Sequence, residues 1–198
     1  MPSVKCTIVG DNGVGKTSLI HVFMGAVLGR DVPRVFGNCY PILTVDGTKI
    51  SFLPTDINAS PEYERLRRLT YPGTDVFLLC FSFDNRASWE SVRTLWYPEI
   101  HLHRPQAPFI LVGTKCDLLD DDLITETLTE RSLHVSREEA AVLAAELGTT
   151  LVECTSALSR DSLTDLFEGA IRLALNQGPQ RERTSLLSHL LSFLPGSS

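Results

Sequence analysis

Residues 10–17 read Gly-Asp-Asn-Gly-Val-Gly-Lys-Thr, and they directly follow the apolar run 4–9, which is typical of a buried strand. In the pattern Gly-x-x-x-x-Gly-Lys-Thr, the glycines let consecutive backbone N–H groups curl around a phosphate chain. Lys16 adds a positive charge near the β- and γ-phosphates, and Thr17 offers a hydroxyl to Mg²⁺. The pattern predicts a nucleotide phosphate site at the start of a helix; the alternative is a glycine-rich turn without a ligand.

The composition is that of one soluble globular domain. The chain has 198 residues, of which 43% are hydrophobic and 21% are charged, so it can build a single core with a short tail. A net charge of -6 argues against non-specific nucleic-acid binding, because no basic face dominates. No apolar run in the sequence approaches the ~20 residues needed to cross a bilayer.

Cysteine usage and the N-terminal sequence indicate a cytoplasmic protein. The five cysteines are odd in number and lack a ligand spacing such as Cys-x-x-Cys, which favours buried thiols in a reducing compartment. They are Cys6, Cys39, Cys80, Cys116 and Cys154. The N-terminus lacks a charged stretch followed by an apolar block, so we expect no secretory signal.

Strand-like and helix-like patterns alternate along the chain, which is the signature of a parallel α/β sheet with helices on both faces. The strand-like runs are 4–10, 42–45, 49–54, 76–82, 109–114 and 150–154. The helix-like stretches are 16–27, 62–69, 87–101, 137–146 and 162–175. Asp46-Gly47 is a hairpin signal, so we expect one strand pair to be antiparallel.

Two segments stand outside this alternation. Residues 118–135 form an extra acidic segment, and they precede a helix that Ser136 is expected to cap, with acidic residues in its first turn. After residue 176 the sequence changes to Gln-Gly-Pro-Gln-Arg-Glu-Arg, which is typical of a linker. We therefore expect one domain over residues 1–177 and a linker with a short tail over residues 178–198.

Three further motifs follow strands, at the edge where open parallel sheets bind ligands. Asp56 follows the third strand-like run and, next to a phosphate loop, is expected to hold Mg²⁺ through water. Thr114-Lys115-Cys116-Asp117 closes the fifth run. The Asp117 carboxylate can accept hydrogen bonds from N1–H and the 2-amino group of guanine, which adenine cannot match, while the Lys115 stem packs along the base. A backbone N–H in Thr155-Ser156-Ala157 can reach the guanine 6-oxo group. Together and in this order, the motifs predict a guanine nucleotide site.

With these motifs the sequence resembles the Rho/Rac branch of the Ras-like small GTPases over residues 3–176. The resemblance also rests on residues 71–78 (Tyr-Pro-Gly-Thr-Asp-Val-Phe-Leu), residues 96–100 (Trp-Tyr-Pro-Glu-Ile) and Ser156-Ala157-Leu158. Segment 118–135 lies where Rho proteins carry an insert helix. The resemblance implies a P-loop small G domain with a six-stranded, mostly parallel sheet. It also implies binding of GTP or GDP with Mg²⁺, and contacts with effectors or regulators of the cytoskeleton.

The resemblance also assigns the contacts with the nucleotide and the metal. The residues expected to bind the nucleotide are Asn12, Gly13, Val14, Gly15, Lys16, Thr17, Ser18, Thr114, Lys115, Asp117, Leu118, Ser156 and Ala157. The residues expected to bind Mg²⁺ are Thr17 and Asp56.

The departures from the family pattern cluster around the γ-phosphate. Switch I carries Arg34 where the family has the Mg²⁺-binding Thr, and a cation cannot bind Mg²⁺. Ser60 in switch II replaces the Gln that orients the attacking water, and its side chain is too short for that role. Ala59 and Asn12 replace glycines, and in the family a side chain at the latter position obstructs hydrolysis and the arginine finger. We expect strongly impaired hydrolysis; the alternative is neutral variation in loops.

Three functions are open on the sequence alone. The first is an atypical Rho-like switch or scaffold that holds GTP, hydrolyses it little and occupies effectors or regulators. The second is a working GTPase with unconventional residues, for which Arg34 is the candidate electrophile. The third is a pseudo-GTPase interaction module without nucleotide. The intact phosphate loop and Asp117 argue against the third function, and Asn12 and Ser60 argue against the second.

The C-terminal tail has two interpretations. Rho-type proteins usually end in a prenylated Cys-a-a-X box, but here no cysteine follows Cys154, so we expect no prenylation. On a helix, residues 184–194 place Ser185, Ser188 and Ser192 on one stripe with leucines around it, which fits a weak peripheral contact with a membrane or a partner. The alternative is a segment that folds back on the domain or stays disordered.

Overall fold

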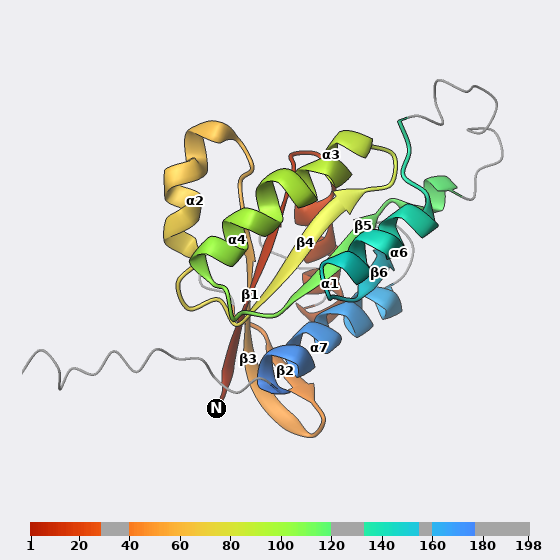
Figure 1. The fold of residues 1–198 in the computed structure, drawn as a ribbon. Coiled ribbons are helices and arrows are strands. Elements are labelled where there is room, and N and C mark those ends of the chain that lie inside the picture. Colours follow the sequence, from red (N-terminus) through yellow and green to blue (C-terminus); the bar gives the residue numbers. More distant parts are fainter. Residues whose placement is uncertain (29–39, 120–132, 155–159, 177–198) are drawn as a thin grey trace, which may run out of the picture.

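A six-stranded sheet with helices on both faces forms the centre of the molecule (Figure 1). The structure is a computed structural model that describes residues 1–28, 40–119, 133–154 and 160–176. The strands are β1 (Ser3–Gly10), β2 (Ile42–Val45), β3 (Thr48–Asp56), β4 (Val76–Ser82), β5 (Phe109–Thr114) and β6 (Leu151–Cys154). This arrangement confirms the predicted mixed α/β class.

The strand order explains where a ligand can bind. The order is β2-β3-β1-β4-β5-β6, and all neighbouring strands are parallel except β2 and β3. Asp46 (φ 49°) and Gly47 (φ 76°) connect that antiparallel pair in the left-handed region, as the hairpin signal predicted. Because the other strands run in one direction, the carboxyl ends of β1, β3, β4 and β5 meet at one edge of the sheet.

Helices α1 (Lys16–Leu28) and α7 (Arg160–Asn176) cover one face of the sheet. Three buried aromatic rings join them to it: Phe23 on α1, Phe52 on β3 and Phe167 on α7. The ring centroids of Phe23 and Phe167 are 4.2 Å apart, and Phe52 meets both rings edge-on at 5.8 and 5.7 Å. Each such pair contributes about 0.5–1.5 kcal/mol beyond its buried area, so this cluster fixes the helix that begins at the phosphate loop.

The opposite face carries a long helix in three parts and a separate helix α6. The long helix consists of α3 (Arg86–Ser91), a π-helical stretch (Val92–Trp96) and α4 (Tyr97–His103). The sequence predicted one α-helix over 87–101, because no local residue pattern marks a π-helical turn. Trp96 and Ile100 point from this helix into the core, where they are almost fully buried.

Helix α6 (Arg137–Glu146) has the predicted bounds, and its N-terminus explains why. The Ser136 hydroxyl accepts a hydrogen bond from the Glu139 N–H at 3.1 Å, and the Glu139 carboxylate accepts one from the Ser136 N–H at 2.9 Å. This reciprocal capping box satisfies two backbone donors that a helix start leaves open. Gly148 then ends the segment with φ 68°.

Helix α2 (Glu64–Thr70) follows a 3-10 turn, Pro61–Tyr63, and the two together span the helix predicted over 62–69. Figure 1 places α2 at the edge of the molecule, beside α4. Most of the extra acidic segment and the whole tail, 178–198, lie outside the described residues, so the insert helix and the domain boundary stay predictions. Within the described part of the chain, no helix is long and apolar enough to span a membrane.

Candidate functional site

The phosphate loop lies between β1 and α1, and its glycines adopt backbone conformations that other residues rarely reach. Gly10, Gly13 and Gly15 have φ values of 142°, 80° and 96°. A Cβ added to Gly10 would lie 2.2 Å from the carbonyl oxygen of Cys80 on β4, which is far inside van der Waals contact. Gly10 therefore lets the loop leave the sheet close to β4, and the other two glycines turn it toward α1.

Lys16 is held inside this loop. Its side chain is buried, and Nζ donates hydrogen bonds to the carbonyl oxygens of Gly10 at 2.8 Å and Asp11 at 2.7 Å. Burial lowers the pKa of Lys16, and the nearby Cys80, Asp56 and Asp11 oppose that shift. An ammonium group has three donors, so the two carbonyls leave one N–H for an anion in the loop.

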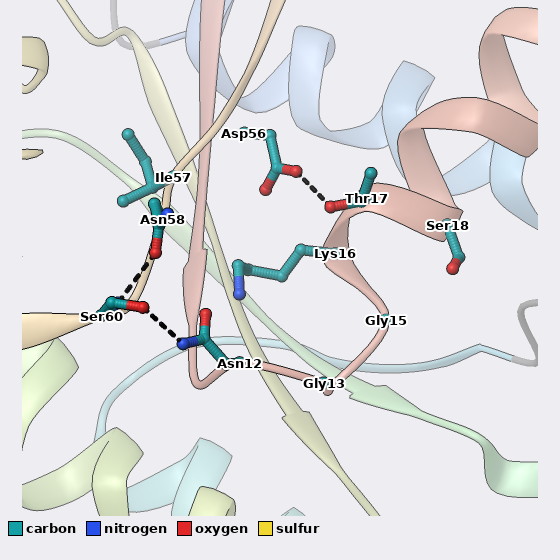
Figure 2. A pocket seen from close by; sticks show the side chains of 10 residues that line it. All are labelled: Asn12, Gly13, Gly15, Lys16, Thr17, Ser18, Asp56, Ile57, Asn58 and Ser60. Atoms are coloured by element: carbon teal, nitrogen blue, oxygen red, sulfur yellow. Dashed lines mark hydrogen bonds between the residues drawn. The ribbon is translucent and has the colours of Figure 1, made fainter. Parts of the chain in front are cut away.

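A cavity of about 640 Å³ opens beside the loop. Figure 2 shows its wall formed from the phosphate loop and the start of α1 on one side and the segment after β3 on the other. The lining residues are Asn12, Gly13, Gly15, Lys16, Thr17, Ser18, Asp56, Ile57, Asn58 and Ser60. The cavity thus brings together six of the expected nucleotide-binding residues and both expected Mg²⁺ ligands, and its size suits the phosphate part of a nucleotide.

Thr17 and Asp56 fit the chemistry of a magnesium ion. The Thr17 hydroxyl donates a short hydrogen bond to the Asp56 carboxylate, and both side chains are exposed to the cavity. Mg²⁺ takes oxygen ligands and commonly binds through one or two protein groups plus phosphate and water. Among the described residues, no group of three or more His, Cys, Asp or Glu could hold a metal alone, so phosphate oxygens and water would complete the coordination.

Two of the residues that depart from the family pattern bind one another across this cavity. The Asn12 side-chain amide donates to the Ser60 hydroxyl at 2.9 Å, and the Ser60 N–H donates to the Asn58 side-chain oxygen at 2.9 Å. Figure 2 shows the Asn12 and Ser60 side chains pointing toward one another from the phosphate loop and the segment after β3. The sequence indicated both residues, but it gave no sign that they are partners.

The residues expected to recognise the base lie at the end of β5, outside the lining of this cavity. Lys115 follows β5, and Asp117 and Leu118 belong to the 3-10 helix Cys116–Leu119. Asp117 is exposed, whereas Lys115 and Leu118 are half-buried. Arg34, Ser156 and Ala157 fall outside the described residues, and their roles stay predictions.

Thr114 links the base side to the phosphate side. Its side chain is fully buried, and its hydroxyl lies 2.6 Å from the carbonyl oxygen of Val14 and 2.9 Å from that of Phe81. Val14, which was also expected to contact the nucleotide, is itself buried with 1% of its surface exposed. The Thr114 side chain therefore connects the end of β5 to the backbone of the phosphate loop at Val14.

We expect Thr114→Val to lower the free energy of unfolding by about 2 kcal/mol, because the substitution keeps the shape but removes the one hydroxyl donor that the two nearby carbonyl oxygens share. Urea denaturation followed by circular dichroism measures this change. The matched control is Thr44→Val on β2, where the side chain is exposed and we expect a change within about 0.5 kcal/mol. Equal effects of the two substitutions would contradict the assigned role.

The first variable residue of the loop, Asp11, is anchored to the long helix. Its two carboxylate oxygens accept hydrogen bonds from the Trp96 indole N–H at 2.7 Å and the Ser91 hydroxyl at 2.8 Å. Ser91 and Trp96 stand at the two ends of the π-helical stretch. The wider turn of the long helix therefore lies at its contact with the phosphate loop.

A buried ion pair continues this contact to α2. Arg67 donates to both oxygens of Glu99 at 2.8 and 2.9 Å, and the two side chains are each 4% exposed. The Tyr71 hydroxyl donates to Glu99 at 2.6 Å, and the Arg67 guanidinium lies 4.9 Å from the Trp96 ring centroid. Burial raises the pKa of Glu99, but the hydrogen bonds from Arg67 and Tyr71 outweigh it and hold the pKa below its usual value.

The sequence reasoning missed this network. In the sequence, Trp96 and Glu99 stand out only as part of a stretch that resembles the family, and Arg67 is one of several basic residues in α2. A pairing 32 residues apart leaves no local pattern. The one available signal was an acidic residue among the mostly apolar positions of the second half of the long helix.

The fold and the site together define a P-loop nucleotide-binding protein. A sequence model described as the Ras family matches residues 5–176, which is most of the chain. The chain therefore belongs to the Ras family of small GTPases. Membership supports binding of a guanine nucleotide, usually with Mg²⁺, and a signalling role with regulator and effector partners.

Proposed function

We propose that this protein is a Rho-like guanine-nucleotide-binding signalling protein that holds GTP with little hydrolysis. It acts as a switch or scaffold for effectors or regulators of the cytoskeleton, from a cytoplasmic location. The observation that carries the proposal is the hydrogen bond between Asn12 and Ser60 across the phosphate cavity.

Hydrolysis of GTP requires a positioned water molecule. An attacking water must be oriented next to the γ-phosphate, and Ras-family proteins use a Gln side chain at the position of Ser60. The Ser60 hydroxyl accepts from Asn12, and its N–H is turned to Asn58. The Ser60 hydroxyl and backbone N–H thus each make a hydrogen bond to a protein atom. By the family resemblance, a side chain at the position of Asn12 also obstructs the arginine finger.

The chemical groups that bind the phosphates and Mg²⁺, by contrast, are retained. Lys16 is fixed in the loop by two hydrogen bonds that leave one N–H for an anion, and the Thr17 hydroxyl lies beside the Asp56 carboxylate. Helix α1 begins at Lys16, so its N-terminal N–H groups and dipole face the same cavity. This combination favours long occupancy of the site over turnover.

The nucleotide content of the purified protein tests the proposal. The protein is denatured, the released nucleotide is identified by chromatography, and γ-phosphate release from reloaded GTP is followed in a single turnover. We expect about one guanine nucleotide per chain and phosphate release slower than the already slow intrinsic rate of small GTPases, about 10⁻⁴ per second. Rapid release would overturn the proposal in favour of a working GTPase.

A variant that cannot hold the phosphates is the reference for a site without nucleotide. Lys16→Met keeps the length of the side chain but removes the charge that holds the phosphates, so we expect it to purify without nucleotide. If the natural protein is also empty and does not load at micromolar GTP or GDP, the chain is a nucleotide-free interaction module, and the proposal is wrong.

A further inference from the structure

Lys115 has an unusual backbone conformation for a residue with a side chain. Among the described residues, only Asp46 and Lys115 combine a side chain with a positive φ, and Asp46 lies in the β2–β3 hairpin, which requires it. Lys115 (φ 57°) follows the last residue of β5. Strained backbone of this kind persists where its surroundings fix it, and it often marks a functional position.

The surroundings of Lys115 fix its backbone from both sides. Before it, the Thr114 carbonyl accepts a hydrogen bond from the Phe83 N–H at 3.1 Å. After it, the Leu118 N–H donates to the Lys115 carbonyl at 3.1 Å and begins the 3-10 helix that carries Asp117. These contacts determine where the Lys115 side chain leaves the end of the sheet.

Asp84 then fixes the far end of that side chain. The Lys115 ammonium donates to the two Asp84 carboxylate oxygens at 2.9 and 3.3 Å, and the side chains are 33% and 27% exposed. Asp84 lies in the turn that follows β4, the strand next to β5. The carboxylate is itself held by the Ser82 hydroxyl, which donates to it through a short hydrogen bond.

Asp84 keeps its charge in this position. Partial burial raises the pKa of Asp84, but the hydrogen bonds from Ser82 and Lys115 outweigh it and hold the pKa below its usual value. The ion pair is therefore formed at neutral pH, with both ends of the lysine side chain held in place before a nucleotide arrives.

We propose that Asp84 is a positioning residue for the nucleotide base and acts through Lys115. By holding the ammonium, it keeps the methylene stem of Lys115 in one place at the end of β5, where the stem packs against the face of a purine. The inference rests on the proposed function, since it assumes that a guanine base occupies this end of the sheet.

The physical reason is preorganisation. A free lysine side chain has many rotamers, and a ligand that packs on its stem must restrict them when it binds. Asp84 imposes that restriction in advance, so the bound base is released more slowly. Neither Lys115 nor Asp84 lines the phosphate cavity, so we expect phosphate binding there to be independent of Asp84.

The experiment compares release of a fluorescent GDP analogue from the full chain and from Asp84→Asn, which removes the charge and keeps the size. We expect release to accelerate about three- to tenfold, the range that corresponds to immobilising one long side chain. Inhibition of analogue binding by inorganic pyrophosphate, which has no base, is expected to stay unchanged. Asp84→Glu is expected to restore slow release in part.

Two controls separate positioning from a general structural effect. Asp46 lies in the β2–β3 hairpin, far from the base motif, and forms an exposed ion pair with Arg172 on α7. The Asp46→Asn variant is expected to release the analogue like the natural protein. In a Lys115→Ala background, Asp84→Asn is expected to have no further effect, because its action passes through that lysine.

The outcomes distinguish the inference from the proposed function. Unchanged release from Asp84→Asn, an equal change in pyrophosphate inhibition, or a persistent effect in the Lys115→Ala background would each overturn the role of Asp84 while the nucleotide site stands. A natural protein that binds neither GDP nor GTP would overturn both.

Discussion

Replacing Glu99 with Ala is expected to lower the free energy of unfolding by about 3–5 kcal/mol, the usual result of removing one partner from a buried ion pair. The substitution leaves the Arg67 guanidinium buried without its carboxylate and the Tyr71 hydroxyl without its acceptor. Urea denaturation should give a lower midpoint with an unchanged slope, because the loss concerns stability and not the surface exposed on unfolding.

An exposed ion pair on α2, the helix that carries Arg67, is the matched control. Glu64 and Arg68 pair on the surface of α2, with side chains 48% and 45% exposed, so Glu64→Ala should cost less than about 1 kcal/mol. The double variant Arg67→Met with Glu99→Met should recover much of the loss, because apolar residues of similar volume can replace a buried pair. A small effect of Glu99→Ala would mean that water reaches Arg67.

The same pair gives the protein a defined response to acid. The pKa of Glu99 is lower in the folded than in the unfolded protein, so the unfolded state binds more protons in the interval between the two values. The contribution of Glu99 is therefore present above its unfolded pKa, about 4.3, and is lost as the pH falls through the lower folded value. The Glu99→Ala protein should lose less stability than the natural protein over that interval.

The combined substitution Asn12→Gly with Ser60→Gln is expected to raise single-turnover GTP hydrolysis by about 100-fold, the lower end of what a positioned proton-transfer or water-orienting group contributes. The first change opens the space beside the γ-phosphate and removes the donor to position 60. The second supplies an amide long enough to orient water. Phosphate release from protein loaded with radiolabelled GTP measures the rate.

Single variants test whether the hydrogen bond or the missing Gln limits the rate. Ser60→Ala breaks the bond with Asn12 without adding a water-orienting group, so we expect no increase in hydrolysis. If the double variant holds GTP and still fails to hydrolyse it, the block lies elsewhere, with Ala59 or Arg34 as the remaining departures around the γ-phosphate.

Elements with local signals could be predicted closely from the sequence. The bounds of β2, β4, β5 and α6 agree with prediction, because a hairpin dipeptide, apolar runs and a capping serine mark them. The phosphate loop and the proximity of Thr17 to Asp56 could also be predicted from the sequence. The first is a continuous motif, and the second follows from the rule that ligands gather at strand ends.

Long-range side-chain pairs could not be predicted from the sequence. Asn12 and Ser60 are 48 residues apart, and Lys115 and Asp84 are 31 apart. Whether two polar side chains meet at such separations depends on strand order, helix register and rotamers, which no short window of sequence contains. The π-helical stretch also escaped prediction, because no local residue pattern marks it, and the residues at its two ends bond to Asp11, which is 80 and 85 residues away in the sequence.

The position of Trp96 has a practical consequence. Its indole is hydrogen-bonded to the phosphate loop through Asp11 and lies under the Arg67 guanidinium of α2, so one fluorophore contacts both segments. The sequence has two tryptophans, and the other, Trp89, sits between Arg86 and Arg93, away from these contacts. With Trp89 replaced by Phe, the emission spectrum becomes a label-free optical readout of the loop and α2 together.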